Sequence, residues 1–223
     1  MAKRPQWVCA EMGTGLIDRK GASAVRPLVA FDFDGTLTCS DSFRDFIAWR
    51  AGPARYVKGL LHIAPEFMEY LRRRDRTALK AAMVGEFLTG AERAELAAEA
   101  ALHAEERSRL LLRPDALACW RRWQAINARL IIITATPEFI VDPFARGLGA
   151  WKLIGTRLAF DEAGRATGGL DGPNCRGAEK VRRLREALGE DVRLEAAYGD
   201  SDGDEEMLAI AEEKGMKIFG LRP

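Results

Sequence analysis

Apolar positions along the chain form short continuous runs that alternate with stretches of helical periodicity. The run Leu28-Val29-Ala30-Phe31 is typical of a strand buried on both faces of a sheet, and residues 129–134 repeat the pattern. Further strands are expected at 152–160, 194–198 and 216–219, and helices at 115–127, 138–148, 177–188 and 204–213. This alternation predicts an α/β fold with a Rossmann-like, three-layer core, in which helices cover both faces of a parallel sheet.

Residues 41–112 show helical periodicity without a convincing strand. Asp41 is placed to cap the first helix of this stretch, and Gly52-Pro53 marks its expected end. We therefore expect an all-α cap over residues 41–112, inserted after the first strand into a catalytic core of residues 28–40 and 113–223. Residues 1–27 mix charges with glycine and lack a long apolar stretch, so we expect a flexible extension there.

The charge balance of the chain is close to neutral. Its 223 residues include 34 Lys and Arg against 33 Asp and Glu, which argues against a broad basic surface and hence against nucleic acid as a partner. The cysteines are scattered without a Cys-x-x-Cys pair, and the sequence shows no apolar signal segment. Both features favour reduced thiols and a cytoplasmic location.

Polar residues follow the predicted strands where each strand ends. Asp32 and Asp34 come directly after the first strand, and because they are two residues apart they can project to the same side. Thr134 ends the next strand, Asp200 follows a third, and Lys180 lies near the start of a helix. Ligands of parallel sheets bind at the carboxyl ends of the strands, so we expect these side chains to meet there. Carboxylate oxygens suit Mg²⁺, and a cation suits phosphate, so the set predicts a phosphoryl-transfer site.

These residues occur in the order of a known set of motifs. The segments concerned are Asp32-Phe33-Asp34-Gly35-Thr36, Thr134, Lys180 and Gly199-Asp200-Ser201-Asp202-Gly203-Asp204. They resemble the motifs of the haloacid dehalogenase (HAD) superfamily, in its phosphoserine-phosphatase-like branch (subfamily IB) with a helical cap. The resemblance extends from about residue 28 to the C-terminus. It implies a Mg²⁺-dependent hydrolase that cleaves a phosphomonoester through an aspartyl-phosphate intermediate.

The same resemblance implies a role for each motif residue. Asp32 would be the nucleophile, and Asp34 would be the general acid and base. Other groups would hold the metal and the phosphoryl oxygens. The implied metal ligands are Asp32, Asp34 through its backbone carbonyl, and Asp200, with Asp204 as support; the implied phosphoryl-binding groups are Thr134, the amide of Ala135, and Lys180.

The motifs indicate the reaction more closely than the substrate. Thr134-Ala135-Thr136 stands where true phosphoserine phosphatases have Ser-Gly-Gly, so we favour a small phosphorylated metabolite without choosing phosphoserine. An alternative is a lipid phosphate such as phosphatidylglycerophosphate, because the apolar residues of 56–70 and the basic run at 72–76 could give the cap a peripheral membrane contact. A phospho-aspartate signalling or interaction module is a further alternative. It is disfavoured because Asp34 would activate water beside the phosphoryl group.

Overall fold

The centre of the molecule is a parallel sheet covered by helices, as the sequence predicts. The computed structural model describes residues 26–73 and 75–223, so the expected extension at 1–27, apart from Arg26 and Pro27, lies outside the described residues. Five strands form the sheet in the order β3-β2-β1-β6-β7, and every neighbouring pair is parallel. They are β1 (Leu28–Phe31), β2 (Arg129–Pro137), β3 (Lys152–Thr156), β6 (Leu194–Gly199) and β7 (Ala211–Met216).

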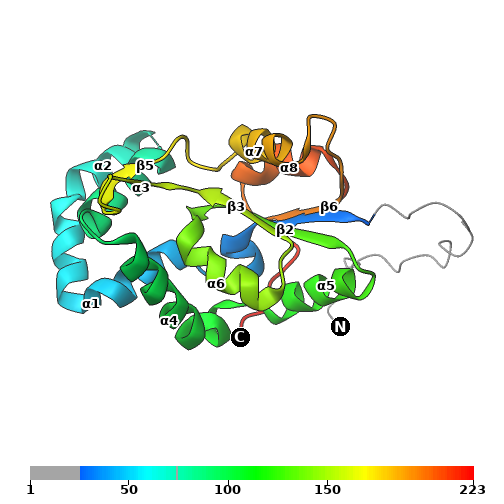
Figure 1. Ribbon diagram of the computed structural model, residues 1–223, viewed down its shortest axis with the longest axis horizontal. Coiled ribbons are helices and arrows are strands. Elements are labelled where there is room, and N and C mark those ends of the chain that lie inside the picture. The colour runs from blue at the N-terminus through cyan, green and yellow to red at the C-terminus, as the bar shows by residue number, and fades with distance from the viewer. Residues whose placement is uncertain (1–25, 74) are drawn as a thin grey trace, which may run out of the picture.

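Residues of the central strand β1 alternate between two apolar clusters, one on each face of the sheet. The covering helices are α5 (Pro114–Ala125), α6 (Glu138–Leu148), α7 (Ala178–Leu188) and α8 (Glu205–Ala209). Val29 and Phe31 pack with residues of α5 and α6, whereas Leu28 and Ala30 pack with residues of α7 and α8, because successive side chains of a strand point to opposite faces. Figure 1 shows α7 and α8 above the sheet and α5 and α6 below it, which confirms the three-layer α/β core.

The register of the three central strands places their carboxyl ends side by side. Phe31 of β1 lies opposite Ile132 of β2 and Tyr198 of β6. The backbone amide of Asp32 then donates to the carbonyl oxygen of Tyr198 at 2.8 Å. The residues that follow these positions therefore start from neighbouring points at one edge of the sheet, the edge that binds ligands in α/β proteins.

Four helices follow β1 and lie at one end of the molecule (Figure 1). We call them the helical segment: α1 (Ser42–His62), α2 (Ala64–Arg73), α3 (Arg76–Leu88) and α4 (Arg93–Leu111). The Asp41 carboxylate accepts from the backbone amide of Arg44 at 2.8 Å and caps α1, as predicted. The expected helix end at Gly52-Pro53 is instead a kink, because Gly52 adopts a φ of 70° and the helix resumes after it.

A two-stranded hairpin, β4 (Leu158–Phe160) with β5 (Ala166–Leu170), packs against the helical segment. Backbone hydrogen bonds join it to the turn after α3, from Gly90 N to Ala166 O at 2.8 Å and from Ala166 N to Ala91 O at 2.9 Å. The expected strand region at 152–160 thus divides between two sheets. The sequence pattern does not predict β5, because its residues ATGGL contain no apolar run. The division into core and cap at residues 112 and 113 stays a prediction.

The C-terminal elements differ from the prediction. The expected helix at 204–213 is wrong in its second half, since α8 ends at Ala209, and the expected strand at 216–219 is wrong because β7 ends at Met216. β7 is an edge strand that carries charges and not an apolar run, so its pattern resembles that of a solvated helix. The apolar residues Ile218 and Phe219 pack against the core cluster around Phe31 without forming a strand.

Candidate active site

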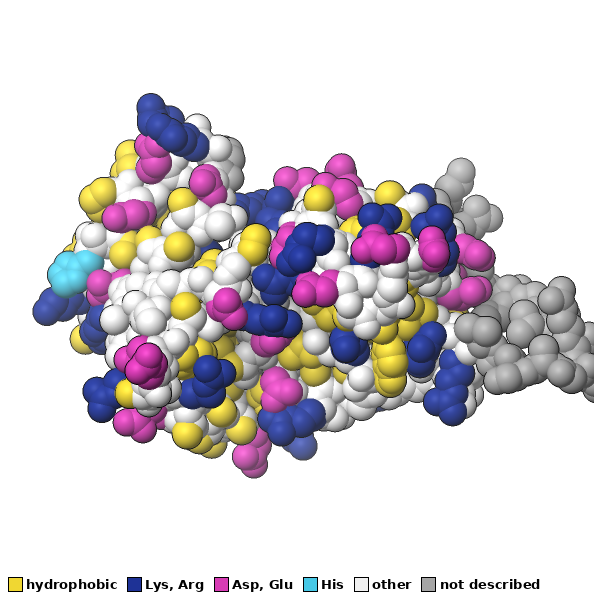
Figure 2. Space-filling view, turned by 45° about the horizontal axis from the view of Figure 1, so that its top comes forward, with side chains coloured by type: hydrophobic (Ala, Val, Ile, Leu, Met, Phe, Trp, Pro, Cys, Tyr) yellow, Lys and Arg dark blue, Asp and Glu magenta, His cyan; other side chains and the backbone are white. Residues whose placement is uncertain are grey.

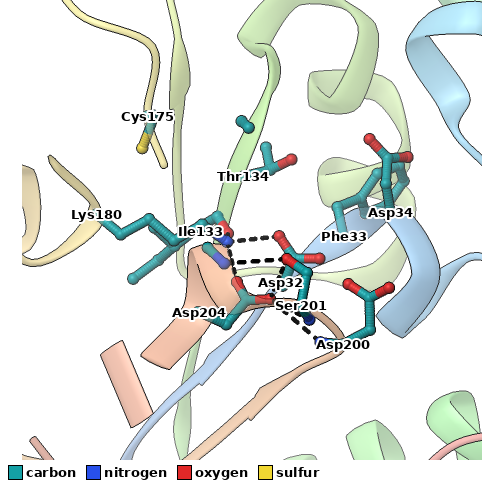
Figure 3. A network of polar contacts seen from close by, with 12 residues as sticks. Asp32, Phe33, Asp34, Ile133, Thr134, Cys175, Lys180, Asp200, Ser201 and Asp204 are labelled. Carbon is teal, nitrogen blue, oxygen red and sulfur yellow. Dashed lines mark hydrogen bonds and ion pairs between the residues drawn. The ribbon is translucent and has the colours of Figure 1, made fainter. Parts of the chain in front are cut away.

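Lys180 joins two carboxylates at the edge of the sheet. Its Nζ donates to Asp32 Oδ1 at 2.5 Å, to Asp204 Oδ1 at 2.6 Å and to the carbonyl oxygen of Ile133 at 2.8 Å. Lys180 is 2 % exposed, and both carboxylates are also buried. Figure 3 shows the three charged side chains converging, one from the end of β1, one from α7 and one from the loop after β6. The fold thus brings three of the predicted site residues into one buried network.

The buried network contains two carboxylates, those of Asp32 and Asp204, but only one ammonium group, that of Lys180. This imbalance of charge shifts the pKa values of Asp32 and Lys180. Burial raises the pKa of Asp32 to about 7; Lys180 opposes the rise, and the charge of Asp204 adds to it. Burial alone would lower the pKa of Lys180, but the charges of Asp32 and Asp204 outweigh burial and raise it. The ammonium therefore stays charged, and a further cation beside Asp32 would balance the network.

The carboxylates at this edge fit a divalent cation. Asp32, Asp200 and Asp204 each offer an oxygen, and these three oxygens lie within 4.8 Å of one another. Asp204 is already engaged, since its Oδ2 accepts from the backbone amides of Asp200 at 3.1 Å and Ser201 at 3.0 Å. The Asp200 carboxylate accepts no hydrogen bond from a described residue, and burial raises its pKa. This set of hard oxygen donors, with one carboxylate unengaged, suits Mg²⁺.

Asp34 lies beside this group with its carboxylate turned away from Lys180, as Figure 3 shows. Its Oδ1 accepts from the backbone amide of Ser42 at 2.8 Å, and its Oδ2 accepts from the hydroxyl of Thr136. Burial raises the pKa of Asp34 to about 6, the charge of Asp41 adds to the rise, and the hydrogen bonds from Ser42 and Thr136 oppose it. A carboxyl group that titrates near neutral pH can both give and take a proton.

Gly35 permits the close approach of the two acidic loops. Its φ of +82° lies in the left-handed region that favours glycine. A Cβ atom at this position would lie 2.2 Å from Asp200 Oδ2, which is far inside van der Waals contact. Glycine is therefore required here so that the loop after β1 can lie directly against the Asp200 carboxylate.

The end of β2 presents hydroxyl and backbone groups to the same site. We call residues 134–136 the phosphate loop, after the role that the sequence predicts. Thr134 is buried, and its Oγ1 accepts from the backbone amide of Thr136 at 3.0 Å, so its own proton is left for an acceptor in the site. The carbonyl oxygen of Ala135 lies 2.7 Å from Thr156 Oγ1 and accepts from Lys80 Nζ.

A cavity of about 440 Å³ lies between the sheet edge and the helical segment. Every site residue predicted from the sequence lines this cavity. The helical segment contributes residues that the sequence reasoning missed, because a side chain on an amphipathic helix carries no motif that would separate it from a surface residue. These residues are Phe43, Tyr70, Arg76, Leu79, Lys80 and Met83; Tyr70 and Arg76 belong to the segments 56–70 and 72–76, for which the sequence indicates only a membrane contact.

Known proteins resemble the chain over most of its length. The sequence model for haloacid dehalogenase-like hydrolases matches residues 29–209, a range that includes all of the predicted site residues. The chain belongs to this family. Within the HAD family, Protein CicA of Caulobacter vibrioides (strain NA1000 / CB15N) is 56% identical over 214 residues, which cover 92% of this chain and 96% of CicA.

Solved structures share the HAD fold described above. A protein of unknown function from Bordetella pertussis Tohama I superposes with a TM-score of 0.68 and 29% identity, covering 83% of this chain and 86% of that chain. Phosphoserine phosphatase in its apo form superposes with a TM-score of 0.59 and 19% identity, covering 86% of each chain. The predicted superfamily and its phosphoserine-phosphatase-like fold are thus confirmed, and membership of the HAD family makes the chain a hydrolase.

Proposed function

We propose that this HAD hydrolase is a Mg²⁺-dependent phosphatase that cleaves a phosphomonoester of a small metabolite through an aspartyl-phosphate intermediate. The buried contact between Asp32 and Lys180, beside Asp200, is the observation that carries the proposal. Lys180 fixes Asp32 Oδ1, whereas Oδ2 forms no hydrogen bond with any residue that the structure describes. One oxygen of a firmly held carboxylate therefore faces a ligand cavity and remains for nucleophilic attack.

In the first proposed step, Asp32 Oδ2 attacks phosphorus and the bond between phosphorus and the substrate's alkoxide oxygen breaks. Asp34, in its protonated form, gives its proton to the departing oxygen; its raised pKa of about 6 favours this role near neutral pH. The hydroxyl of Thr134 and the amide of Ala135 bind the phosphoryl oxygens, and the ammonium of Lys180, whose three N–H groups already have acceptors, stabilises these oxygens by its positive charge. These groups are fixed before the reaction, so they need little rearrangement as charge develops.

In the second proposed step, Asp34 takes a proton from water, and the water oxygen attacks the phosphorus of phospho-Asp32. The bond between phosphorus and Asp32 breaks, which releases inorganic phosphate and restores the carboxylate. When bound by Asp32, Asp200 and the backbone carbonyl of Asp34, Mg²⁺ supplies positive charge that stabilises the phosphoryl oxygens. Asp204 supports this arrangement because it fixes both Lys180 and the backbone of the Asp200 loop.

Phosphate release by the purified protein tests the proposal. We expect Mg²⁺-dependent release from soluble phosphomonoesters, in a panel that includes phosphoserine, sugar phosphates and lipid phosphates in detergent. A chelator such as EDTA should stop the release, and fresh Mg²⁺ should restore it. Release that persists fully in EDTA would contradict the metal requirement, and no release from any compound would contradict the proposed function.

A second candidate, a lipid-phosphate phosphatase, is favoured by exposed apolar side chains on two consecutive helices of the helical segment. Val57 and Leu61 of α1 and Phe67 and Met68 of α2 are 47–70% exposed. Figure 2 shows apolar side chains among charges of both signs at this end of the molecule. None of the described helices is long and apolar enough to cross a membrane. Faster release from phosphatidylglycerophosphate in detergent than from every soluble compound would favour this candidate over a small metabolite.

Asp34→Asn should lower kcat by about 10²–10⁴-fold, because the amide can neither protonate the leaving oxygen nor activate water. The loss should be larger for alkyl phosphates than for p-nitrophenyl phosphate, whose leaving group needs little protonation. Phospho-Asp32 should also accumulate, which mass spectrometry of the acid-quenched protein detects. As a matched control, Asp191→Asn changes an exposed carboxylate before β6 and should leave kcat unchanged. Equal losses for good and poor leaving groups would contradict the acid role of Asp34.

A further inference from the structure

Lys80 connects the helical segment to the phosphate loop. It lies on α3, and its Nζ donates to the carbonyl oxygen of Ala135 and, at 3.2 Å, to Asn174 Oδ1. Thr156 Oγ1 lies 2.7 Å from the Ala135 carbonyl oxygen and 2.9 Å from Asn174 Oδ1, so the three residues around Lys80 share one network. Asn174 Nδ2 donates back to Thr77 Oγ1 of α3 at 3.3 Å. Thr77 and Lys80 of α3 therefore both form hydrogen bonds with residues at the carboxyl edge of the sheet.

The acceptors of the Lys80 ammonium are all uncharged. Among the described residues, no carboxylate forms an ion pair with Lys80, although the side chain is half-buried and lines the cavity. Burial lowers the pKa of Lys80 to about 8, and the carboxylates of Asp41, Asp34 and Asp32 only partly oppose this shift. A half-buried cation that has neutral partners gains stabilisation when an anion enters the same cavity. The phosphoryl group of the proposed substrate is such an anion.

Lys80 also restricts the orientation of the backbone at Ala135, because it donates a hydrogen bond to the carbonyl oxygen of that residue. The carbonyl that Lys80 holds lies in the residue whose amide would bind the phosphoryl oxygens. Because a peptide unit is planar, the held Ala135 carbonyl also fixes the amide of Thr136, and it restricts the amide of Ala135 only through the two dihedral angles at the Ala135 Cα. Charged donors also form stronger hydrogen bonds than neutral ones, so the ammonium contributes more than the Thr156 hydroxyl.

We propose that Lys80 is a positioning residue that the helical segment contributes to the phosphoryl-binding site. Its ammonium orients the phosphate loop through the Ala135 carbonyl and favours the binding of a phosphoryl dianion. This inference rests on the proposed function for its catalytic consequence, but it also makes a statement about phosphate affinity that needs no turnover. It gives the helical segment a part in phosphoryl binding, in addition to its contribution to the cavity wall.

Lys80→Met and Lys80→Arg test the inference with p-nitrophenyl phosphate and Mg²⁺. Lys80→Met should raise the KM and the Kd for inorganic phosphate, measured by calorimetry, by about 10-fold each, since a charged hydrogen-bond donor is lost. Lys80→Arg keeps the charge and should stay within about three-fold of the parent protein. Lys58→Met is the matched control, because Lys58 is exposed on α1 and does not line the cavity. Thermal unfolding of each variant checks that the fold persists.

The pH dependence of phosphate binding separates the charge of Lys80 from a purely structural tie. As pH rises from about 7.5 to about 9.5, the parent Lys80 loses its proton and the Kd for phosphate should rise, whereas the Kd of Lys80→Arg should stay level. The other titratable groups that face Lys80 are the same in the parent protein and in Lys80→Arg, so the difference between the two pH profiles reports on residue 80. These groups are Asp41 before α1, Asp32 and Asp34 after β1, for which burial raises the pKa to about 7 and about 6, and the thiol of Cys175, whose pKa burial raises to about 11.

Two results would overturn the inference. An unchanged Kd for phosphate in Lys80→Met would show that the ammonium does not serve phosphoryl binding. Parallel pH profiles in the parent protein and Lys80→Arg would show that its charge is irrelevant. If the parent protein releases no phosphate from any substrate, the proposed function fails, and the inference on Lys80 is then decided by the calorimetric Kd alone.

Discussion

Asp32→Asn is expected to lower kcat about 10⁴-fold or more and to abolish the phosphorylated form of the protein. The asparagine oxygen can still accept the hydrogen bond from Lys180, so the arrangement around residue 32 should persist. An amide, however, is a poor nucleophile and carries no charge. Phosphate release, together with mass spectrometry of the acid-quenched protein, measures both effects.

Measuring the stability of Asp32→Asn shows whether the variant is still folded when its activity is lost. The raised pKa of Asp32 means that its ionised form is disfavoured in the folded protein at neutral pH. Removing that charge should therefore leave the free energy of unfolding equal to or above that of the parent protein. Asp191→Asn, which changes an exposed aspartate, serves as the control for activity. A variant at position 32 that turns over within about tenfold of the parent would remove Asp32 from the role of nucleophile.

The sequence predicts the centre of this fold well because the central strands are buried on both faces. Every side chain of a continuous apolar run such as Leu28–Phe31 is shielded from water when helices cover both faces of the sheet. Such a run therefore indicates the strand itself and the helices that cover it. The edge strand β7 has one side open to solvent and carries charges, and its pattern is therefore ambiguous. Because the charged residues of β7 resemble a solvated helix, the sequence predicts a helix to residue 213, whereas α8 ends at Ala209 and β7 begins at Ala211.

The predicted site residues share a cavity because each follows the end of a parallel strand or the start of a helix beside it. That rule places Asp32, Thr134 and Asp200 together without any knowledge of contacts. Lys80 follows no such rule, since it belongs to α3 and meets the phosphate loop only through the packing of the helical segment on the core. Residues contributed by a separate layer need the three-dimensional structure, because their spacing along the chain is that of an ordinary amphipathic helix.

Lys180→Met should lower the free energy of unfolding by about 3–5 kcal/mol and remove activity. Methionine keeps much of the buried volume, but it leaves two carboxylates, Asp32 and Asp204, without their shared cation. The carbonyl oxygen of Ile133 also loses the donor that it has at 2.8 Å. Urea unfolding measures the stability change, and Lys214→Met, which changes an exposed lysine of β7, is the control.

The stability loss in Lys180→Met should grow as pH rises. Without the ammonium, the folded-state pKa of Asp32 rises further above its unfolded value, because nothing then opposes the effect of burial on this carboxylate. A carboxyl group with a raised pKa destabilises the fold increasingly above its unfolded pKa, so the difference from the parent should be small near about pH 4 and large near about pH 8. Adding Asp204→Asn removes one of the unpaired charges and should recover part of the loss at the higher pH. A loss that is independent of pH and unchanged in the double variant would show that Lys180 stabilises the fold by packing and not as the shared cation of two carboxylates.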